Sequence, residues 1–405
     1  MTAHWRESEP YRLLFPVGIL LALIGVGLWP LFLFKITTTY PIVAHPRLMI
    51  EGFSACFILG FLGTALPVML NTKRFHHWQM FLWAGGIAAA AVFHLMLRTM
   101  IGDIVFASTI LFFLSCVAVR FVQRQDRPPP GLVTVLLGLA CAVTGSTMQA
   151  IYRHDPSMGP VFYNLSRLLL NQAFLLLPVL GIAAFILPVF VGYPRRQSPP
   201  EMNRTPHAWL LEMFWMLGFG LLIIGSVVIE AFGFIREGNL MRGFVLLIFL
   251  ARNLPVFLKQ KNPGAVPWLT RLSLLTLPVG FLVIGFIPNT PMAGLHILYI
   301  SGLALLILSV ATRVITAHGG FQKLFFAKWP LLWWIFALIT AAMITRVSAE
   351  WIGKSRALEH YAYAGITWII AIAIWFSAMI RCLLNIELEP PAHQIQIKGQ
   401  PKQGI

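Results

Sequence analysis

Two histidines, His296 and His318, stand near opposite ends of one apolar stretch that is long enough to cross a membrane. They are 22 residues apart in the chain. In a regular helix this separation corresponds to roughly 33 Å of length, close to the thickness of a bilayer's hydrocarbon core. At about 100° per residue, the two side chains would point within roughly 40° of each other. They are too far apart to share one metal, so we expect two sites, one near each membrane surface and both facing the bundle interior.

Further histidines fall near the ends of apolar segments, and their expected depth divides them into two groups. The group expected near the outer surface contains His45, His94, His154, His296 and His360. The group expected near the cytoplasmic surface contains His4, His76, His77, His207 and His318. Imidazole is the usual membrane-embedded ligand of haem iron and copper, and two histidines on facing helices at equal depth can hold a haem. The alternative is that each ring packs on apolar surface while its nitrogens reach interfacial water.

Other polar residues in the apolar segments argue against several classes of chemistry. The sequence contains no P-loop, no G-x-S-x-G and no H-E-x-x-H pattern. No carboxylate or lysine stands at the middle of an expected span, where an ion-coupled transporter usually has one. The acidic residues near the span ends are Glu51, Asp103, Glu212, Glu230 and Glu350. The most deeply placed polar residues are Thr144, Asn171 and Gln172, which we interpret as contacts between helices.

The elements that must position these residues are membrane-spanning helices. Of the 405 residues, 58% are hydrophobic and only 11% are charged, whereas soluble domains are about one quarter charged. Long apolar runs predict an all-α, polytopic transmembrane helical bundle rather than a β-barrel. About twelve spans are expected, at 13–34, 48–70, 77–97, 101–122, 131–152, 165–192, 207–232, 239–258, 267–287, 291–315, 328–347 and 358–384. They form one transmembrane domain over residues 1–388, and we expect the polar tail at 389–405 to be disordered.

The formal charge of +16 reflects membrane orientation rather than nucleic-acid binding, because no basic cluster of the kind that follows a phosphate backbone is present. With the N-terminus in the cytoplasm, 20 of the 30 Lys and Arg residues fall on the cytoplasmic side. This bias predicts that both termini lie in the cytoplasm. The four cysteines all fall in apolar spans without a C-x-x-C pair, so we interpret them as small core residues.

Two sequence motifs resemble those of a known family. The segment HPRLMIEGF at 45–53, followed by GFLGTALP at 60–67, resembles the second span of the NnrS family. The segment HILYISG at 296–302, followed by LSVATRVITAHGG at 308–320, resembles that family's tenth span. The family pattern in the second span reads W-H-A-H-E-M-x-x-G-F. Aligned on Gly52 and Phe53, His45 matches its first histidine, whereas Arg47 and Leu48 replace its second histidine and its glutamate. The family's G-H-T-G-R reads A-H-G-G at 317–320 here, which keeps the histidine, His318, but loses the threonine and the arginine.

The resemblance implies a bacterial inner-membrane protein that carries haem and copper and is linked to nitric oxide stress. It implies a protein embedded in the lipid bilayer, with nitric oxide or a redox protein as a further partner. The residues that it implies bind the cofactor are His45, His296, Arg313 and His318. Together with the outer histidines, the candidate metal ligands are His45, Met49, His94, His296, His318 and His360. The replaced histidine at Arg47 leaves two outcomes open, one in which the chain keeps the haem and has lost the copper and one in which it has lost both.

Two other functions remain open from the sequence alone. A transporter or channel for a small substrate without a metal cofactor fits the number of spans, although no ionisable group is expected near the midplane. A structural subunit of a respiratory complex also fits. No pattern in the sequence assigns an enzymatic reaction.

Overall fold

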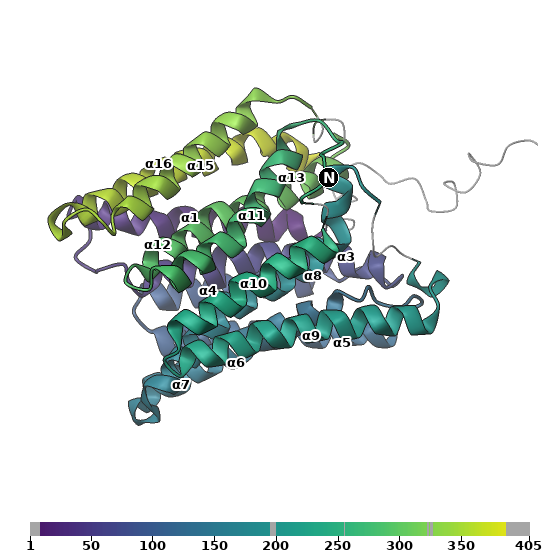
Figure 1. Cartoon of the computed structure of the whole chain (residues 1–405), viewed down its shortest axis with the longest axis horizontal. Coiled ribbons are helices and arrows are strands. Elements are labelled where there is room, and N and C mark those ends of the chain that lie inside the picture. The colour runs from purple at the N-terminus through teal and green to yellow at the C-terminus, as the bar shows by residue number, and fades with distance from the viewer. Residues whose placement is uncertain (1–8, 195–199, 255, 322–323, 325–326, 386–405) are drawn as a thin grey trace, which may run out of the picture.

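The structure is a computed structural model that describes residues 9–194, 200–254, 256–321, 324 and 327–385. The described residues form helices and turns without a strand, which confirms the predicted all-α fold. The long helices run side by side in one bundle (Figure 1). The expected tail at 389–405 and its boundary at residue 388 lie outside the described residues.

Successive spans alternate in direction and are joined by short connections, and several spans consist of two or three contiguous helical segments. In chain order they are α1 (Pro10–Leu33), α2 (Ala44–Arg47), η2 (Leu48–Ser54), α3 (Ala55–Met69), α4 (His77–Leu95), α5 (Thr99–Val122), α6 (Leu132–His154), η3 (Pro156–Met158), α7 (Gly159–Leu168), η4 (Leu169–Ala173), α8 (Phe174–Val191), η5 (Glu201–Asn203), α9 (Pro206–Ala231), α10 (Ile235–Asn253), α11 (Ala265–Phe286), α12 (Pro291–His296), η6 (Ile297–Ala304), α13 (Leu305–His318), α15 (Pro330–Ser348) and α16 (Lys354–Leu384). Four of the α-helices, α1, α9, α12 and α15, begin at a proline, whose fixed φ and missing N–H suit the first helical position.

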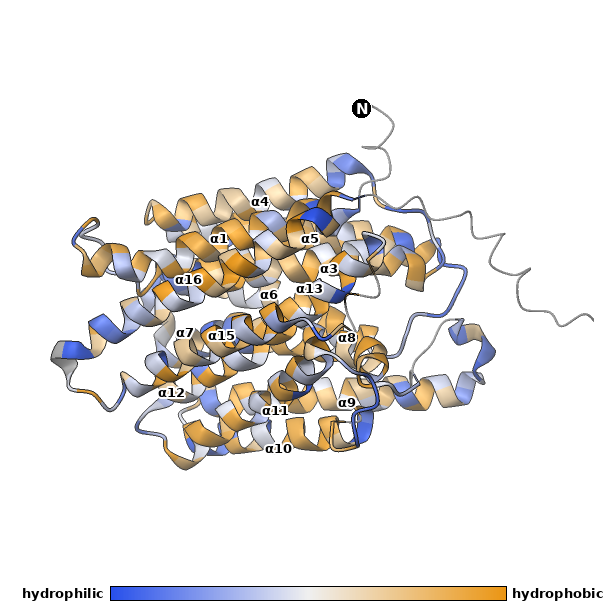
Figure 2. Ribbon diagram, turned by 90° about the horizontal axis from the view of Figure 1, so that it is seen from above, coloured by the Kyte–Doolittle hydropathy of each residue, from blue (hydrophilic) through white to orange (hydrophobic). Residues whose placement is uncertain are grey.

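Eleven helical segments among the described residues are long and apolar enough to cross a membrane, so the chain is a multi-pass membrane protein. Helix α10 is not among these eleven, because its 19 residues include several charged side chains. It nevertheless packs lengthwise against α9 and α11, at the position where the sequence predicts the eighth span. Apolar residues cover most of the helices, and hydrophilic ones gather at helix ends and connections (Figure 2).

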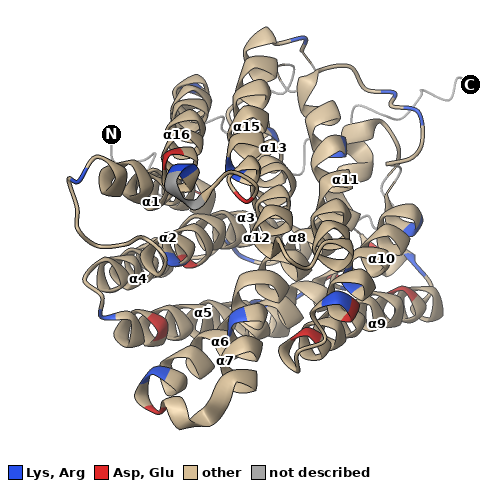
Figure 3. Cartoon of the chain, turned by 60° about the vertical axis from the view of Figure 1, so that its left-hand side comes forward, with Lys and Arg blue, Asp and Glu red and all other residues tan. Residues whose placement is uncertain are grey.

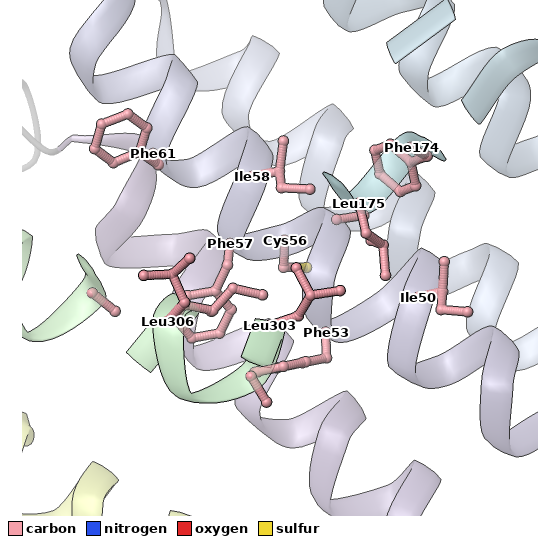
Figure 4. Close-up of a cluster of buried hydrophobic side chains, with 14 of the residues drawn as sticks. Ile50, Phe53, Cys56, Phe57, Ile58, Phe61, Phe174, Leu175, Leu303 and Leu306 are labelled. Atoms are coloured by element: carbon pink, nitrogen blue, oxygen red, sulfur yellow. The ribbon is translucent and has the colours of Figure 1, made fainter. Parts of the chain in front are cut away.

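The second, sixth and tenth spans form the centre of the bundle. Their most apolar stretches are 89%, 78% and 72% buried, against at most 56% for any other span. They lie four spans apart in the chain, so each successive group of four spans supplies one central span. Figure 4 shows where they meet, with side chains such as Phe57, Phe174 and Leu306 in one hydrophobic cluster. The four cysteines are buried in the protein without a disulfide, which confirms their interpretation as core residues.

Each central span contains a π-helical segment, a rare and wider form of helix that often marks functional sites. These segments are η2, η4 and η6, with five to eight residues each. Because η6 lies between His296 and His318, an angle of 100° per residue does not hold across that span. The sequence prediction that the two histidines share one helix face therefore assumed a regular helix that the structure does not have.

The first and last described residues, Glu9 and Asn385, lie at the same end of the bundle, which we call the terminal end. There Arg12, in the first turn of α1, donates hydrogen bonds to the backbone carbonyls of Leu383 and His318. Asn385 donates a third hydrogen bond, 2.8 Å long, to the carbonyl of Gly319. These bonds tie the start of α1 to the ends of α13 and α16.

Candidate functional site

A cavity of about 650 Å³ lies inside the bundle near the end opposite the terminal end. Its wall includes Trp29, Arg153 and Arg346, which lie near the last turns of α1, α6 and α15, and Met292 at the start of α12. We call this end the cavity end. A concave site of this size, lined mostly by apolar residues with a few polar groups, is typical of ligand-binding pockets.

All three π-helical segments contribute to the cavity wall. The contributing residues are Met49, Ile50, Phe53 and Ser54 from η2, Asn171 and Gln172 from η4, and Tyr299, Ile300, Leu303 and Ala304 from η6. The wider turn of a π helix changes which side chains face one direction. The three π-helical segments therefore help to decide which side chains line the cavity.

His45 lies near the start of the second span, half-buried in the cavity wall. Its Nδ1 atom is 3.0 Å from the backbone carbonyl oxygen of Gly25, and its ring packs edge-on against Trp29, with centroids 5.9 Å apart. A carbonyl oxygen can only accept a hydrogen bond, so Nδ1 is the donor. The neutral ring then keeps an unprotonated Nε2 atom, which is the arrangement found in metal-binding histidines.

His296 reaches the same cavity from the tenth span and has the same arrangement. Its Nδ1 atom is 2.7 Å from the carbonyl oxygen of Met292, one helical turn earlier, so its Nε2 atom is also unprotonated in the neutral ring. The depth of His296 is set by close contact of α12 with α11. A Cβ atom added to Gly294 would lie 2.4 Å from the carbonyl oxygen of Gly280, so only glycine fits there.

Four arginines line the cavity and give it a cationic character: Arg47, Arg153, Arg167 and Arg346. Arg346 pairs with Glu350 at 3.1 Å and stacks over the Tyr361 ring at 4.1 Å. It is also close enough to His45 and His296 to interact with both electrostatically. Among the described residues, Arg167 has no ion-pair or hydrogen-bond partner. The cavity therefore combines two imidazoles with guanidinium groups suited to an anionic or carboxylate-bearing ligand.

Behind Arg47 lies a buried ion-pair network. The guanidinium of Arg47 is 2.5 Å from Glu51 and 3.1 Å from Asp103, while Nε2 of His94 is 2.8 Å from the other oxygen of Glu51. Arg153 reaches Asp103 at 3.3 Å. Acidic and basic residues therefore lie next to each other around α2 and α4 (Figure 3). The two carboxylates are balanced by two arginines, which keeps the network neutral in a setting where an unpaired charge is costly.

Ligand atoms of Glu51, His94 and Asp103 lie within 4.8 Å of one another, a spacing compatible with a metal ion. The guanidinium of Arg47, however, already contacts both carboxylates. A divalent cation added beside it would give the buried group a net positive charge. The group is therefore complete as an ion-pair network, and His94 as a metal ligand remains a prediction.

The remaining predicted residues lie in different places. Met49 lines the cavity, one turn after His45. His360 lies outside the wall, with Nδ1 at 3.2 Å from Ser348 Oγ and 3.3 Å from the Thr345 carbonyl oxygen. His318 lies at the terminal end, where its Nδ1 atom is 2.8 Å from Glu9. Arg313 is on α13, two turns before the terminal end, and does not line the cavity. The structure thus brings together three of the predicted ligands, His45, Met49 and His296.

The sequence interpretation missed several polar residues of the cavity: Gln149, Arg153, Arg167, Gln172, Tyr299 and Arg346. Gln172 was interpreted only as a contact between helices. It does make such a contact, because its Oε1 atom accepts a hydrogen bond from Arg242 of α10, but it also lines the cavity. Two adjacent amide side chains, Asn171 and Gln172, in the middle of an apolar span were the sequence signal that could have indicated a cavity residue here.

Comparison with known proteins agrees with the motifs. The family model described as NnrS protein matches residues 7–386, which is nearly the whole chain. This match confirms the resemblance predicted from the segments at 45–67 and 296–320. No curated protein matches the chain.

Proposed function

Because this chain belongs to the NnrS family, we propose that its cavity binds haem and that the protein acts in the bacterial response to nitric oxide. His45 and His296 would hold the haem iron. The observation that carries this proposal is their shared geometry. Two histidines from the second and tenth spans line one cavity, and each fixes Nδ1 on a backbone carbonyl. Each therefore leaves Nε2 available to a metal.

The remaining wall residues fit a flat, largely apolar group with acidic arms. Apolar and aromatic side chains, including Phe53, Ile300 and Trp368, would cover the faces of such a group and exclude water. Guanidinium groups suit its carboxylates. Arg346 is already held in place by Glu350 and by the Tyr361 ring, so it loses little side-chain entropy on pairing.

When bound, haem would supply an iron centre that binds diatomic gases and exchanges single electrons. The chain's own contribution is to orient the ligating rings and to set the polarity around them. His45 is fixed against Gly25 and Trp29, and His296 is fixed by Met292 and the contact of α12 with α11. Fixed ring orientation and basicity are the usual effects of such hydrogen bonds on metal ligands.

Copper is a second candidate for the same cavity. Met49 supplies a thioether sulfur to the wall, four residues after His45. A thioether combined with imidazole is a soft ligand set that suits copper. A metal assay on the purified protein distinguishes the two metals.

The experiment is a reduced-minus-oxidised visible spectrum of the detergent-purified protein, with iron and copper assayed on the same sample. We expect a haem Soret band in the wild type and at least a tenfold loss of haem content in His45→Ala and in His296→Ala. The control variants are His318→Ala at the terminal end and His154→Ala at the exposed last residue of α6. Both should retain haem.

A protein purified from haem-replete cells without haem or copper would contradict the proposal. Equal haem loss in His318→Ala and His296→Ala would contradict the assignment of the ligands to the cavity. Uptake of a small solute by proteoliposomes containing the metal-free protein would instead favour the transporter alternative.

A further inference from the structure

The sixth span presents a row of hydrogen-bond donors to the cavity. Its lining residues include Asn164, Arg167, Asn171 and Gln172, of which the last two belong to η4. Arg167 is notable because the other three cavity arginines all form ion pairs, with Glu51, Asp103 or Glu350. In the described part of the chain, no carboxylate pairs with Arg167. A cation in a membrane-embedded wall is costly without a counter-charge, so its position indicates an anionic partner.

Gln172 lies on the same wall and is fixed as a donor. It is only 2% exposed, and its Oε1 atom accepts a hydrogen bond from Nη1 of Arg242. Because a guanidinium can only donate, the amide cannot be flipped without bringing two donors together. The amide nitrogen of Gln172 therefore has its two N–H groups left over, and among the described residues no hydrogen bond uses them.

Arg242 is rigidly held, which makes this orientation of Gln172 stable. It is fully buried, pairs with Glu230 at 3.0 Å, and donates a 2.9 Å hydrogen bond to Ser226 Oγ. Its guanidinium also lies over the Phe281 ring at 4.9 Å. Glu230, the carboxylate of this group, is therefore already paired with Arg242 and does not neutralise Arg167.

Tyr299 connects Arg167 to the neighbourhood of Gln172. Its hydroxyl donates a 3.1 Å hydrogen bond to the carbonyl oxygen of Asn171, the residue before Gln172. The charges of Arg167 and Arg242 both act on the Tyr299 hydroxyl. The Arg167 guanidinium and the Gln172 amide line the same cavity from one span, five residues apart in the chain.

We propose that Arg167 and Gln172 form an anion-binding subsite of the cavity, which takes a planar, oxygen-bearing anion. A guanidinium fork and an amide N–H₂ group match the two oxygens of a carboxylate or of a small oxyanion. The anion has two sources, a free oxyanion or a carboxylate arm of a cofactor bound in the same cavity. The subsite itself is argued from the cavity alone, and only the second source rests on the proposed haem.

The test is a calorimetric titration of the detergent-purified full-length protein with sodium nitrite as the probe. The Soret band is recorded in the same titration, so that nitrite binding at a haem iron is seen separately. The variants are Arg167→Gln, which removes the charge, and Gln172→Glu, which keeps the shape and can still accept from Arg242. The matched control is Arg98→Gln, because Arg98 is exposed at the start of α5 at the same end of the bundle.

Binding of nitrite that weakens at least tenfold in both variants but not in the control would support a free oxyanion as the ligand. If nitrite does not bind, at least tenfold faster haem loss in both variants, but not in the control, would support a carboxylate arm of the cofactor. Unfolding temperatures within a few degrees of wild type show that the variants fold. Unchanged nitrite binding and unchanged haem loss in both variants would overturn the subsite. If His296→Ala loses haem but still binds nitrite, the anion subsite exists independently of haem binding.

Discussion

Arg47 lies between two buried carboxylates, which makes the residues around it dependent on one another. Its guanidinium contacts Glu51 and Asp103, and its second nitrogen also donates a 3.1 Å hydrogen bond to Gln149 in the cavity wall. Gln149 in turn donates to Ser166. Together with His94 of α4, which contacts Glu51, the network connects the second to sixth spans and fixes part of the cavity wall.

Glu51→Ala is expected to lower the free energy of unfolding by about 3–5 kcal/mol, because it leaves the Arg47 and His94 side chains buried without their closest acidic partner. Thermal unfolding in detergent measures this change. The control is Glu359→Ala, which removes an exposed carboxylate from α16. The double variant Arg47→Met with Glu51→Leu should be less destabilised than Glu51→Ala, since it removes both charges. A Glu51→Ala variant as stable as wild type would show that the network is not stabilising.

At the residue scale, the sequence identified two histidines of the cavity wall but not most of the polar residues around them. His45 and His296 stood at equal expected depth and within family motifs, and both line the cavity. Arg167 and Arg346 gave no comparable signal, since an arginine near a span end usually extends to the interface. Whether such a side chain points to lipid, to water or into a cavity depends on helix rotation. That rotation is set by packing between distant spans.

Among the elements, the three π-helical segments were not predictable from apolar periodicity. A π segment follows from how one helix packs against its neighbours, whereas run length and hydropathy are the same for α and π turns. Most span boundaries were predicted to within a few residues, although the span expected at 165–192 begins at Pro156. The expected span at 291–315 corresponds to Pro291–His318, and that at 77–97 corresponds to His77–Leu95. Their ends follow from the length of apolar runs, which the bilayer thickness dictates.

Gly280→Ala and Gly294→Ala are expected to separate α11 from α12 and to displace His296. Overpacking of this kind typically costs about 1–3 kcal/mol. An added Cβ at either position would meet the backbone of the other at 2.4–2.7 Å. Haem content and thermal unfolding of the purified variants measure the two effects, and both should fall.

The matched controls for this prediction are Gly218→Ala and Gly225→Ala in α9, where an added Cβ would have no atom within 4 Å. They should leave haem content unchanged and keep or slightly raise stability, because alanine favours helix. If all four variants behave alike, the contact between α11 and α12 does not position His296.

On the scale of the whole molecule, each group of four spans contributes one buried, π-containing span to the centre. The fifth and sixth spans also contact buried ion pairs through glutamines of the cavity wall, since Gln149 accepts a hydrogen bond from Arg47 and Gln172 accepts one from Arg242. The first network joins the second to sixth spans, and the second network joins the sixth span to α9 and α10. This arrangement explains why the charges at the ends of several spans are buried rather than exposed to lipid.

The orientation of the molecule in the membrane decides which compartment the cavity serves. The bias of Lys and Arg predicts that the terminal end faces the cytoplasm and that the cavity end faces outward. Ser157 is exposed after α6 at the cavity end, and Gln123 is exposed after α5 at the terminal end. The four native cysteines are buried, so a new surface cysteine gives the main labelling signal.

A membrane-impermeant maleimide should therefore label Ser157→Cys in intact cells, and it should label Gln123→Cys only after the membrane is permeabilised. The wild-type protein measures the background from the native cysteines. The reverse pattern would place the cavity on the cytoplasmic side, because Ser157 and Gln123 flank opposite ends of the bundle. In that orientation, ligands of the cavity would come from the cytoplasm, and the family's proposed role in nitric oxide handling would operate there.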